Sequence, residues 1–502
     1  MRVLLIIPTY YQDAKEKEVY RYLPPMGLAY IASALEQINC QVRIFDVMGR
    51  DSKIKKVIDE FSPDCIGICC FTPNYPHFVK TLKHIRIFYQ KPIIAGGPHF
   101  HILEEAFKSI KFLPLDLCII GEGEKSFPEV IRRIESSGDF SGIDGTISKI
   151  DHKIVVGNSR KPIENLDEIR FPAWHLLELK SYESLNMPIH TSRGCPYNCI
   201  YCSSGKIWGS KVRFRSPENA VEEMRILSKN FGYSRFFISD DTFVLNGKRI
   251  KKFADLLEKE NFQFFCNGRI NLMTDEIFKD LKRAGCIEVD YGIESVVQRI
   301  LNNLKKNQLS DKIEEIIKKT CQYGMKPSGY YMLSLPGESH EDMKKTIDFA
   351  NYLKRKYGCP ADFQLTRIYP GTQLAEIAKL SKDHDWSVKL YHNLRYPNMP
   401  VYHELPFETV YKLIKKVNFR AVKYPIKQHL KTWLKTPIKK IPPLYHFLKG
   451  IMDYCRNRLY LRRLKNLYKR EGIWKSPNEK MSGMKKERST KETLKEEKVS
   501  VR

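Results

Sequence analysis

The first 135 residues alternate short apolar runs with helical stretches, and this alternation constrains the fold more than any other feature of the chain. The apolar runs are VLLIIP, QVRIFD, DCIGICCF, PIIAGG and DLCIIG, and segments such as MGLAYIASALEQ lie between them with helical periodicity. Nearly continuous apolar strands separated by helices are typical of a parallel sheet that is covered on both faces. The sequence therefore predicts a doubly wound, Rossmann-like α/β domain over residues 1–150.

Glycine and small polar residues follow several of these predicted strands. Ligands of doubly wound sheets bind beyond the carboxyl ends of the strands, and glycine lets a large ligand come close to the backbone. Ordinary tight turns are the alternative explanation for these glycines. The fingerprint GxGxxG does not follow the first strand, which argues against a dinucleotide ligand. The residues at these strand ends are Thr9, Tyr10, Asp46, Cys70, Phe71, Thr72, Pro73, Gly96, Gly97, Pro98, His99, Gly121, Glu122, Gly123 and Glu124.

Three cysteines lie close together in the segment HTSRGCPYNCIYCSS. Cys195, Cys199 and Cys202 have the spacing CxxxCxxC, and three such thiolates can hold a soft metal or three corners of an iron–sulfur cube. A cluster held this way leaves one iron open to a substrate or a cofactor. The alternatives are a zinc site with His190 as the fourth ligand, and a disulfide.

A second series of strand and helix patterns follows the cysteines. PIHTSRG, RFFISDD, FQFFCNGR, IEVDYGIES, KPSGYYMLSLPG and DFQLTRIYPGT make six βα units, which predict an open or partial barrel. In such barrels the chemistry collects at the carboxyl ends of the strands. Helix capping, a mutual ion pair and simple turns are the alternative roles for the polar residues found there. These residues are Asp240, Asp241, Asn267, Arg269, Glu294, Ser295, Gly337, Glu338 and Arg367.

Over about residues 1–375 these motifs resemble the cobalamin-binding radical S-adenosylmethionine (radical SAM) enzymes. The segments that carry the resemblance are LPPMGLAYIASALE, GGPH, GEGE, RGCPYNCIYC, ISDDTF, GIES, LSLPGES and YPGT. The branch resembled includes anaerobic magnesium-protoporphyrin monomethyl ester cyclases and hopanoid- or lipid-modifying methylases. The resemblance implies an anaerobic enzyme that modifies an unactivated carbon by radical chemistry, most simply by methylation, on a lipid or another apolar substrate.

The resemblance also assigns roles by position. Cys195, Cys199 and Cys202 would hold a 4Fe–4S cluster whose fourth iron binds the methionine part of S-adenosylmethionine. The family's mechanism passes an electron into the sulfonium and yields a 5′-deoxyadenosyl radical that abstracts hydrogen. The residues implied to bind S-adenosylmethionine are Asp240, Asp241, Arg269 and Glu294.

Cobalamin is implied as the cofactor of the first domain, with one departure from the family pattern. The usual cobalt-ligand motif DxHxxG is absent, and the loop after the first strand contains PTYYQD, so no histidine there can bind cobalt from below. The expected state is histidine-off cobalamin, and a domain that has lost cobalamin is the alternative. The residues implied to contact it are Thr9, Tyr10, Cys70, Phe71, Thr72, Gly96, Gly97, Glu122, Gly123 and Glu124.

Most of the positive charge lies towards the C-terminus. Of the net charge of +27, residues 408–475 contribute +16, because they hold 19 lysines and arginines against 3 acidic residues. Apolar residues at helical spacing are interleaved with these charges, a pattern that suits an anionic membrane surface. Packing on the barrel and RNA binding are the alternatives. From residue 476 onward large apolar residues become rare, so a disordered tail is expected.

The expected organisation and location of the chain follow from these patterns. No run of about 18 apolar residues occurs, and the 13 cysteines show no disulfide framework, so we expect a cytoplasmic protein that attaches peripherally to the inner face of the membrane through residues 408–475. The expected regions are a cobalamin-type domain at 1–150, a linker at 151–186, the partial radical SAM barrel at 187–376, a basic, mainly helical region at 377–475 and the tail at 476–502.

The expected partner is an external electron donor of the flavodoxin or ferredoxin type. Nucleic acid is not expected as a partner, because the chain has no recognisable RNA-binding signature. Three alternative functions remain open from the sequence: a radical cyclase of the porphyrin type that transfers no methyl group, an RNA-modifying radical SAM enzyme, and a metal-binding scaffold without activity.

Overall fold

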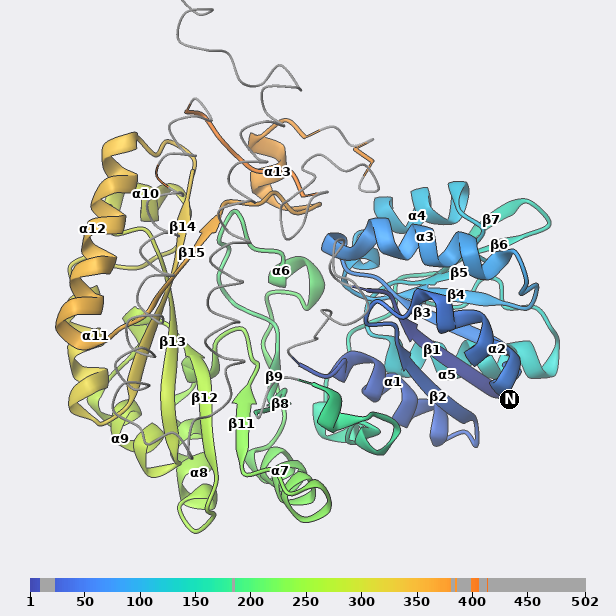
Figure 1. Cartoon of the computed structure of the whole chain (residues 1–502), viewed down its shortest axis with the longest axis horizontal. Helices are drawn as coiled ribbons and strands as arrows, with labels where there is room; N and C mark the ends of the chain where they lie inside the picture. Colours follow the sequence, from blue (N-terminus) through green and yellow to red (C-terminus); the bar gives the residue numbers. More distant parts are fainter. Residues whose placement is uncertain (10–22, 183–185, 381–383, 386–398, 406–412, 414–502) are drawn as a thin grey trace, which may run out of the picture. The chain divides into compact units, whose positions relative to one another are not determined.

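The computed structural model describes residues 1–9, 23–182, 186–380, 384–385, 399–405 and 413. Nearly all of them belong to one compact unit, which comprises Met1–Leu390 and Arg395–Glu404. The expected basic helices and the tail fall almost entirely outside the described residues. Within the unit, two large sheets are built from strands that alternate with helices (Figure 1).

A seven-stranded sheet forms the N-terminal part, in the order β2-β1-β3-β4-β5-β6-β7. The first five strands along the chain pair in parallel, as the sequence predicts, in the flavodoxin-like order with a switch point between β1 and β3. The strands β6 and β7 add an antiparallel hairpin at one edge, which the sequence analysis does not anticipate. The strands are β1 Arg2–Ile7, β2 Gln41–Asp46, β3 Cys65–Cys69, β4 Ile93–Gly96, β5 Leu117–Ile119, β6 Thr146–Ile150 and β7 Lys153–Val156.

Helices cover this sheet on both faces because its strands are apolar on both sides. In β1, Leu4 and Ile6 pack in one core with α2, α3 and α4, while Val3, Leu5 and Ile7 pack in a second core with α1 and α5. All five of these strand side chains are at most 2% exposed. The helices are α1 Met26–Glu36, α2 Ile54–Phe61, α3 Tyr75–Arg86, α4 Leu103–Phe112 and α5 Gly123–Ser136.

A six-stranded sheet follows, in the order β15-β14-β13-β12-β11-β8, and every strand pair in it is parallel. This open, all-parallel arrangement is the partial barrel that the six βα units predict. A separate two-stranded ladder joins β9 to β10 just before and after the cysteine motif. The strands are β8 Met187–Ile189, β9 Ser192–Arg193, β10 Arg213–Phe214, β11 Arg235–Ile238, β12 Gln263–Gly268, β13 Cys286–Glu294, β14 Lys326–Leu333 and β15 Ala361–Leu365.

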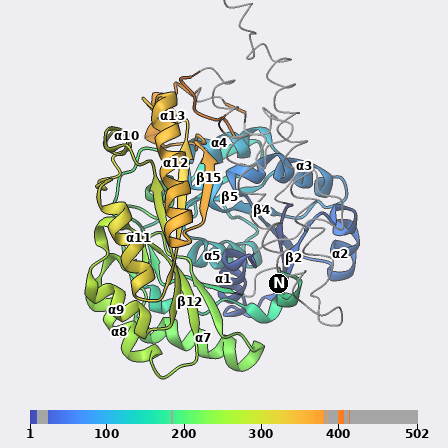
Figure 2. The ribbon, with the colours of Figure 1, turned by 60° about the vertical axis from the view of Figure 1, so that its left-hand side comes forward.

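Long amphipathic helices pack on one face of this second sheet (Figures 1 and 2). Phe236 and Phe264 lie under them and are at most 1% exposed, whereas their neighbours Phe237 and Phe265 stack on the opposite face with ring centroids 4.5 Å apart. Alternate residues of a strand point to opposite faces, so the same strands supply both the core and the open side. The helices are α7 Pro217–Phe231, α8 Gly247–Leu257, α9 Asp275–Arg283, α11 Lys312–Gln322 and α12 His340–Tyr357.

Local sequence signals set the ends of these helices. Ser339 begins α12 with a capping box, in which its hydroxyl accepts from the backbone of Asp342 and the Asp342 carboxylate accepts from the backbone of Ser339. Gly358 ends the helix in the left-handed conformation that glycine adopts at little cost. Shorter helices are α6 Ser204–Ile207, α10 Gln298–Asn303 and α13 Gln373–Ile377.

The described chain after the barrel turns back along its last strand. Ile368 and Tyr402 donate backbone hydrogen bonds to the carbonyls of Pro400 and Thr366, and Arg367 bridges Val401 in antiparallel fashion. Met399 is completely buried in the core of the first sheet. Residues 399–405 lie within the region 377–475 that the sequence analysis expects to be mainly helical, but none of them is helical.

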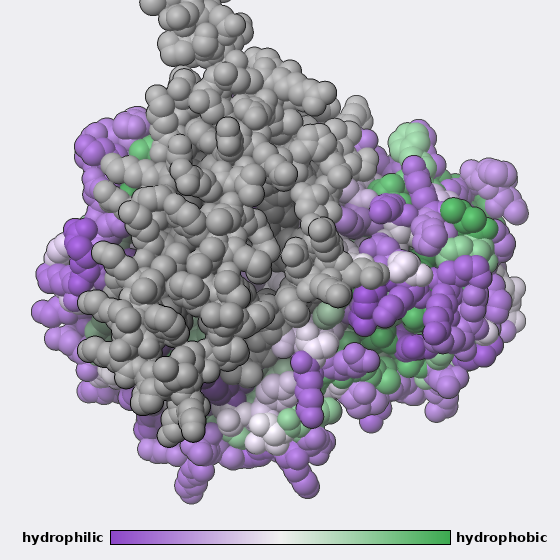
Figure 3. All heavy atoms as spheres, viewed as in Figure 1, coloured by the Kyte–Doolittle hydropathy of each residue, from purple (hydrophilic) through white to green (hydrophobic). Residues whose placement is uncertain are grey.

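The surface drawn in Figure 3 is largely polar over the described residues, with apolar side chains scattered among the charged ones. The most exposed large apolar residues include Ile87 and Phe112, at 77% and 72%. In the described part of the chain, no helix combines the length and the hydropathy that a bilayer span requires.

Candidate functional site

The three cysteines of the motif lie on one loop that leaves the first strands of the partial barrel. The loop follows β9, and Cys195, Cys199 and Cys202 all carry free thiols. Because the strands of the sheet are parallel, this loop lies at the edge where their carboxyl ends meet. The structure therefore brings the motif to the edge that carries the predicted polar residues.

Asp240, at the end of β11, fixes the start of this loop. Its Oδ1 accepts the backbone N–H groups of Thr191 and Ser192 at 2.6 and 3.0 Å, and its Oδ2 accepts their two hydroxyl groups at 2.5 and 2.6 Å. The side chain is completely buried. A buried carboxylate is tolerated when hydrogen bonds satisfy its oxygens, and here four donors do so.

Ile200 anchors the middle of the loop. Its side chain packs in an apolar cluster with Ile300, Leu304 and Leu335. Its backbone N–H donates to the Leu304 carbonyl at 3.1 Å, and its carbonyl accepts from Leu374 at 2.9 Å. The residues between Cys199 and Cys202 are thus held against helices that follow β13 and β15.

The thiols themselves are partly buried, and burial raises the pKa of Cys195 and Cys202. In the described part of the chain, no three His, Cys, Asp or Glu side chains already stand in positions that could hold a metal ion. The thiols would therefore have to turn towards one another to hold a cluster. His190, the alternative zinc ligand, is half-buried and packs its ring against Trp208 with centroids 5.8 Å apart, and none of its described contacts is with a cysteine.

Glu294 joins the cysteine loop to β13. Its Oε1 accepts the hydroxyl of Tyr201, which lies between Cys199 and Cys202, and the ammonium group of Lys306, each at 3.0 Å. Its backbone φ is +62°, a region that non-glycine residues seldom occupy, and the pairing of β13 with β14 is irregular at this point. The strain and the ion pair together place this carboxylate beside the motif.

Arg269, which follows β12, also contacts the motif. Its guanidinium lies 3.5 Å from the ring centroid of Tyr197, and its Nε donates to Asn271 at 3.1 Å. The side chain is 6% exposed, and its Nη2 has no hydrogen-bond partner in the described structure. The ion pair with Glu294 that the sequence left open does not form, since Glu294 pairs with Lys306 instead. Arg269 therefore keeps a buried donor that suits an anionic ligand.

The remaining strand-end residues differ in burial and in the hydrogen bonds that they form. Asp241 is exposed and accepts one hydrogen bond, from Ser204 at 2.8 Å. Asn267 donates to the Asp240 carbonyl, and Ser295 contacts Thr346 at the base of α12. Burial raises the pKa of Glu338 to about 8.

The loops after β14 and β15 complete this edge. Gly337 has a φ of +72°, and its N–H donates to Glu404 at 2.9 Å. Arg367 follows β15 and pairs with Val401 in an isolated antiparallel bridge, and its Nη1 donates to Gln364 at 3.4 Å. Neither residue contacts the cysteine loop among the described hydrogen bonds.

The strand ends of the first sheet form a second candidate surface. Thr9 accepts from the backbone of Gly49 at 2.9 Å, and Thr72 lies 3.0 Å from the Nδ1 atom of the buried His99. Gly97 has a φ of +108°, and a Cβ there would stand 2.7 Å from the Cys70 carbonyl, so only glycine fits. Cys70 is buried, while Phe71, Gly96 and Gly97 are half-buried. Tyr10 lies outside the described residues.

The GEGE segment has a role that the sequence analysis misses. Glu122 and Glu124 accept ion pairs from Arg193 at 2.6 and 2.5 Å, and Glu122 also pairs with Arg213 at 2.8 Å. Gly123, between them, lies close to Ile31, whose Cδ1 would be 2.8 Å from an added Cβ. Arg193 lies two residues before Cys195 and Arg213 eleven residues after Cys202, but no local pattern pairs either of them with the GEGE segment.

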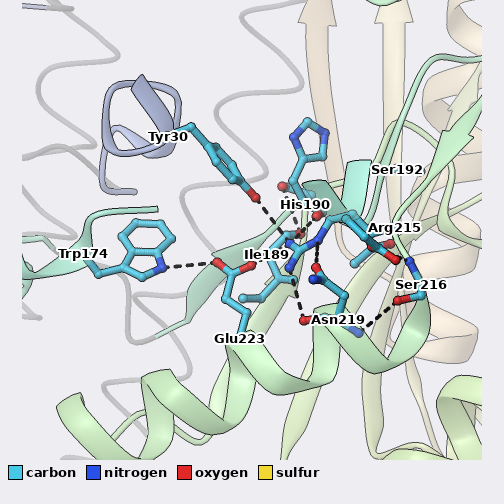
Figure 4. A network of polar contacts seen from close by, with 12 residues as sticks. Tyr30, Trp174, Ile189, His190, Ser192, Arg215, Ser216, Asn219 and Glu223 are labelled. Carbon is cyan, nitrogen blue, oxygen red and sulfur yellow. Dashed lines mark hydrogen bonds and ion pairs between the residues drawn. The ribbon is translucent and has the colours of Figure 1, made fainter. Parts of the chain in front are cut away.

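A second buried network joins Tyr30 of α1, and Trp174 in the segment before β8, to the barrel (Figure 4). Arg215 donates to Glu223 at 2.6 Å, to Tyr30 at 3.3 Å and to the His190 carbonyl at 2.9 Å, and Trp174 donates to Glu223 at 3.2 Å. Glu223 is completely buried. Arg215 and Glu223 are only eight positions apart, but Tyr30 and Trp174 lie 185 and 49 positions from their partners, so no local pattern in the sequence pointed to the network.

Comparisons with known proteins agree with this geometry. Residues 189–350 match the family model of the radical SAM superfamily, and residues 17–131 match that of the B12 binding domain. An uncharacterised methyltransferase of Pyrococcus horikoshii is 32% identical over 392 residues, which cover 75% of this chain and 83% of that protein.

Two further proteins extend the comparison. The cytidylyl-2-hydroxyethylphosphonate methyltransferase of Streptomyces wedmorensis is 28% identical, over 70% of this chain and 77% of its own. Among solved structures, the methyltransferase TsrM of Kitasatospora setae, with cobalamin and a 4Fe–4S cluster bound, superposes with a TM-score of 0.62 at 18% identity, over 75% of this chain and 74% of its own. At that identity the likeness concerns the fold.

The four hydrogen bonds of Asp240 lead to a first prediction. Changing Asp240→Ala should destabilise the protein by several kcal/mol, because each hydrogen bond to a charged acceptor contributes roughly 1.5–3 kcal/mol. The cysteine loop should loosen, and the iron retained after anaerobic reconstitution should fall below half of the wild-type amount. The neighbouring Asp241→Asn change is the control, since it alters one exposed contact and should leave both quantities near wild type. Equal iron retention in the two variants would contradict the anchoring role.

Proposed function

Since this chain belongs to the cobalamin-binding radical SAM enzymes, we propose that it methylates an unactivated carbon of its substrate. The observation that carries the proposal is the loop of three free thiols, held by Asp240 and Ile200 at the carboxyl edge of a six-stranded parallel sheet. The chain joins this sheet to a B12-binding domain. Its relatives from P. horikoshii and S. wedmorensis are both named as methyltransferases.

The residues around the loop fit a cluster and its bound S-adenosylmethionine. Cys195, Cys199 and Cys202 would hold the 4Fe–4S cluster, since they are free thiols on one short loop. When bound, the cluster would pass on the electron, and S-adenosylmethionine would supply both the radical and the methyl group. Cobalamin would carry the methyl group to the substrate. Everything else that the reaction requires, such as orientation and exclusion of water, comes from the protein.

Two charged side chains support the site for S-adenosylmethionine. The unpartnered Nη2 of Arg269 is a buried donor suited to the carboxylate of the ligand. Glu294 would accept the ribose hydroxyls, and its 3.0 Å ion pair with Lys306 compensates its burial. Of the two neighbouring aspartates, Asp241 has acceptor capacity left for the amino group, because Asp240 already accepts four hydrogen bonds.

The carboxyl edge of the first sheet would hold cobalamin. Among the described residues, no atom lies nearer than 3.9 Å to an added Cβ at Gly96 and none within 4 Å of one at Gly121, which supports an open backbone for a large ligand. Thr9, the residues Cys70 to Thr72 and Gly97 complete this edge. His99 at this edge is completely buried and its Nδ1 contacts Thr72, so its ring is not exposed to a ligand on the surface. We therefore keep the expectation of histidine-off cobalamin.

Radical SAM enzymes take their electron from an external reductant. A flavodoxin or ferredoxin would fit this chain, since both deliver single electrons at low potential. The methylated molecule itself is not named by the residues at the site. The relative from S. wedmorensis is named for a nucleotide-linked phosphonate, and a lipid or other apolar acceptor is the substrate class we propose for this chain.

The experiment that tests the function follows the methyl group. Anaerobically reconstituted protein, supplied with hydroxocobalamin, a reductant and methyl-labelled S-adenosylmethionine, should transfer label to a component of an extract from its host cells. Cys195→Ala, Cys199→Ala and Cys202→Ala combined should abolish the transfer, because the cluster has no other ligands on the loop. Formation of 5′-deoxyadenosine without label in any product would favour the cyclase alternative, and tight zinc binding without iron–sulfur absorption would exclude radical chemistry.

The ribose contact can be tested separately. Glu294→Gln removes the charged acceptor and should weaken S-adenosylmethionine binding by about tenfold, which corresponds to about 1.4 kcal/mol, measured by equilibrium dialysis with the iron content unchanged. Lys306→Met is the matched control, because it breaks the same ion pair but leaves the carboxylate in place. Weakening in both variants to the same extent would assign the effect to the ion pair rather than to the ribose contact.

We also propose that residues 408–475, which lie outside the described residues apart from Leu413, bring the enzyme to an anionic membrane. Their net charge of +16 supports this, because each Lys or Arg at such a surface contributes about 1 kcal/mol. The full chain should co-sediment with liposomes of anionic lipid at low salt, and high salt or deletion of residues 408–502 should release it. Tight RNA binding without liposome binding would instead support the RNA-modifying alternative.

A further inference from the structure

Four buried charged side chains lie between the loop after β5 and the ladder of β9 and β10. Arg193 donates one Nη to Glu122 and the other to Glu124, at 2.6 and 2.5 Å. Arg213 donates to Glu122 at 2.8 Å and to the Ile163 carbonyl at 2.6 Å. The four side chains are between 3% and 10% exposed. We call Glu122, Glu124, Arg193 and Arg213 the inter-sheet ion cluster.

One end of the inter-sheet ion cluster is rigidly connected to the cysteine loop. Arg193 is followed by Gly194 and then Cys195. Gly194 has a φ of +105°, and a Cβ there would lie 2.4 Å from the Lys211 carbonyl, so only glycine fits and the backbone packs closely against the segment that leads to Arg213. Arg193 and Arg213 are also paired directly in the ladder of β9 and β10. A displacement of either arginine is therefore passed to Cys195.

The other end of the cluster belongs to the proposed cobalamin surface. Glu122 and Glu124 follow β5, whose carboxyl end lies beside that of β4 and its Gly96. Glu122 also accepts the backbone N–H of Ile163 at 2.6 Å, which fixes its second oxygen. Although burial favours the neutral acid, the ion pairs with Arg193 and Arg213 hold the pKa of Glu122 below its ordinary value. The carboxylate is thus charged and has few alternative positions.

The guanidinium of Arg193 is held in one orientation. It lies 4.9 Å from the ring centroid of Trp208 and 5.6 Å from that of Tyr30, so aromatic rings from the barrel and from α1 both contact it. A planar guanidinium can bridge two carboxylates with separate N–H groups, whereas a lysine ammonium acts as a point charge on a flexible stem. The geometry is therefore specific to arginine.

We propose that Arg193 is a positioning residue that couples occupancy of the cobalamin surface to the arrangement of the cluster-bearing loop. The proposal rests on the proposed function, since it requires that cobalamin and the 4Fe–4S cluster bind where the comparisons and the residues indicate. A ligand that orders the loop after β5 would order Glu122 and Glu124, and through Arg193 it would order Gly194 and Cys195. By thermodynamic linkage, a loaded cluster must strengthen cobalamin binding by the same factor.

The test measures this factor on the full chain. The dissociation constant of hydroxocobalamin is determined anaerobically by equilibrium dialysis, once for the iron-free protein and once for the reconstituted protein. In the wild type, cluster loading should tighten hydroxocobalamin binding by at least about fivefold, the lower end of typical coupling between sites. In Arg193→Lys the ratio of the two constants should fall to about one, while the iron content of the reconstituted protein is retained.

Two further variants keep the test decisive. Glu124→Gln is nearly isosteric and removes a single ion pair, so it should fold even if Arg193→Lys does not, and it should also lower the ratio. Glu223→Gln is the matched control, because it removes a buried carboxylate paired with Arg215 in the neighbouring network of Figure 4 without touching the loop after β5. It should keep the wild-type ratio.

The outcomes separate the inference from the function on which it rests. If wild-type protein binds both hydroxocobalamin and a cluster but shows a ratio of one, the coupling is overturned while the proposed function stands. If Glu223→Gln lowers the ratio as much as Glu124→Gln, the effect belongs to any loss of a buried ion pair, and the inference is again overturned. If the wild type binds no hydroxocobalamin, or loads no cluster, it is the proposed function that fails.

Discussion

The rest of the site depends on the buried carboxylate of Asp240. This one side chain satisfies two backbone N–H groups and two hydroxyls of Thr191 and Ser192, and so it fixes the direction in which the chain enters the cysteine loop. A charge buried in this way is stable only while all its donors remain in place. The loop start, β8 and β11 therefore behave as one element.

Further along the loop, aromatic residues within the motif join it to other strand ends. Tyr201 donates to Glu294 on β13, and Tyr197 packs against Arg269 after β12. These contacts hold the charged groups of Glu294 and Arg269 against two aromatic residues of the cysteine motif, and Lys306 compensates the charge of Glu294. This distribution supports the proposed site for a zwitterionic ligand with hydroxyl groups, because each charge of such a ligand would have a counterpart within the protein.

Part of the fold and of the site could be predicted because it is encoded in short stretches of sequence. The apolar runs specify the parallel strands, and the spacing of Cys195, Cys199 and Cys202 predicts a loop that binds a metal cluster. The partners of these residues were harder to predict. Glu122 and Glu124 were expected only at the cobalamin surface, yet they form ion pairs with Arg193 and Arg213, about 70 to 90 positions away. Single-sequence patterns carry no information on such distant pairs.

The sequence by itself determined the two α/β sheets, the order of their strands along the chain and the chemical types at the strand ends. Periodicity and motif spacing are local properties of the chain, so they can be recognised before the packing is known. Only the tertiary structure decided that Asp240 accepts four hydrogen bonds from the loop while Asp241 accepts one from Ser204. It also decided that Glu294 pairs with Lys306 rather than with Arg269, and that β6 and β7 extend the first sheet. Those outcomes depend on which buried charges and strand edges meet in space, and that is set by the packing of elements distant in sequence.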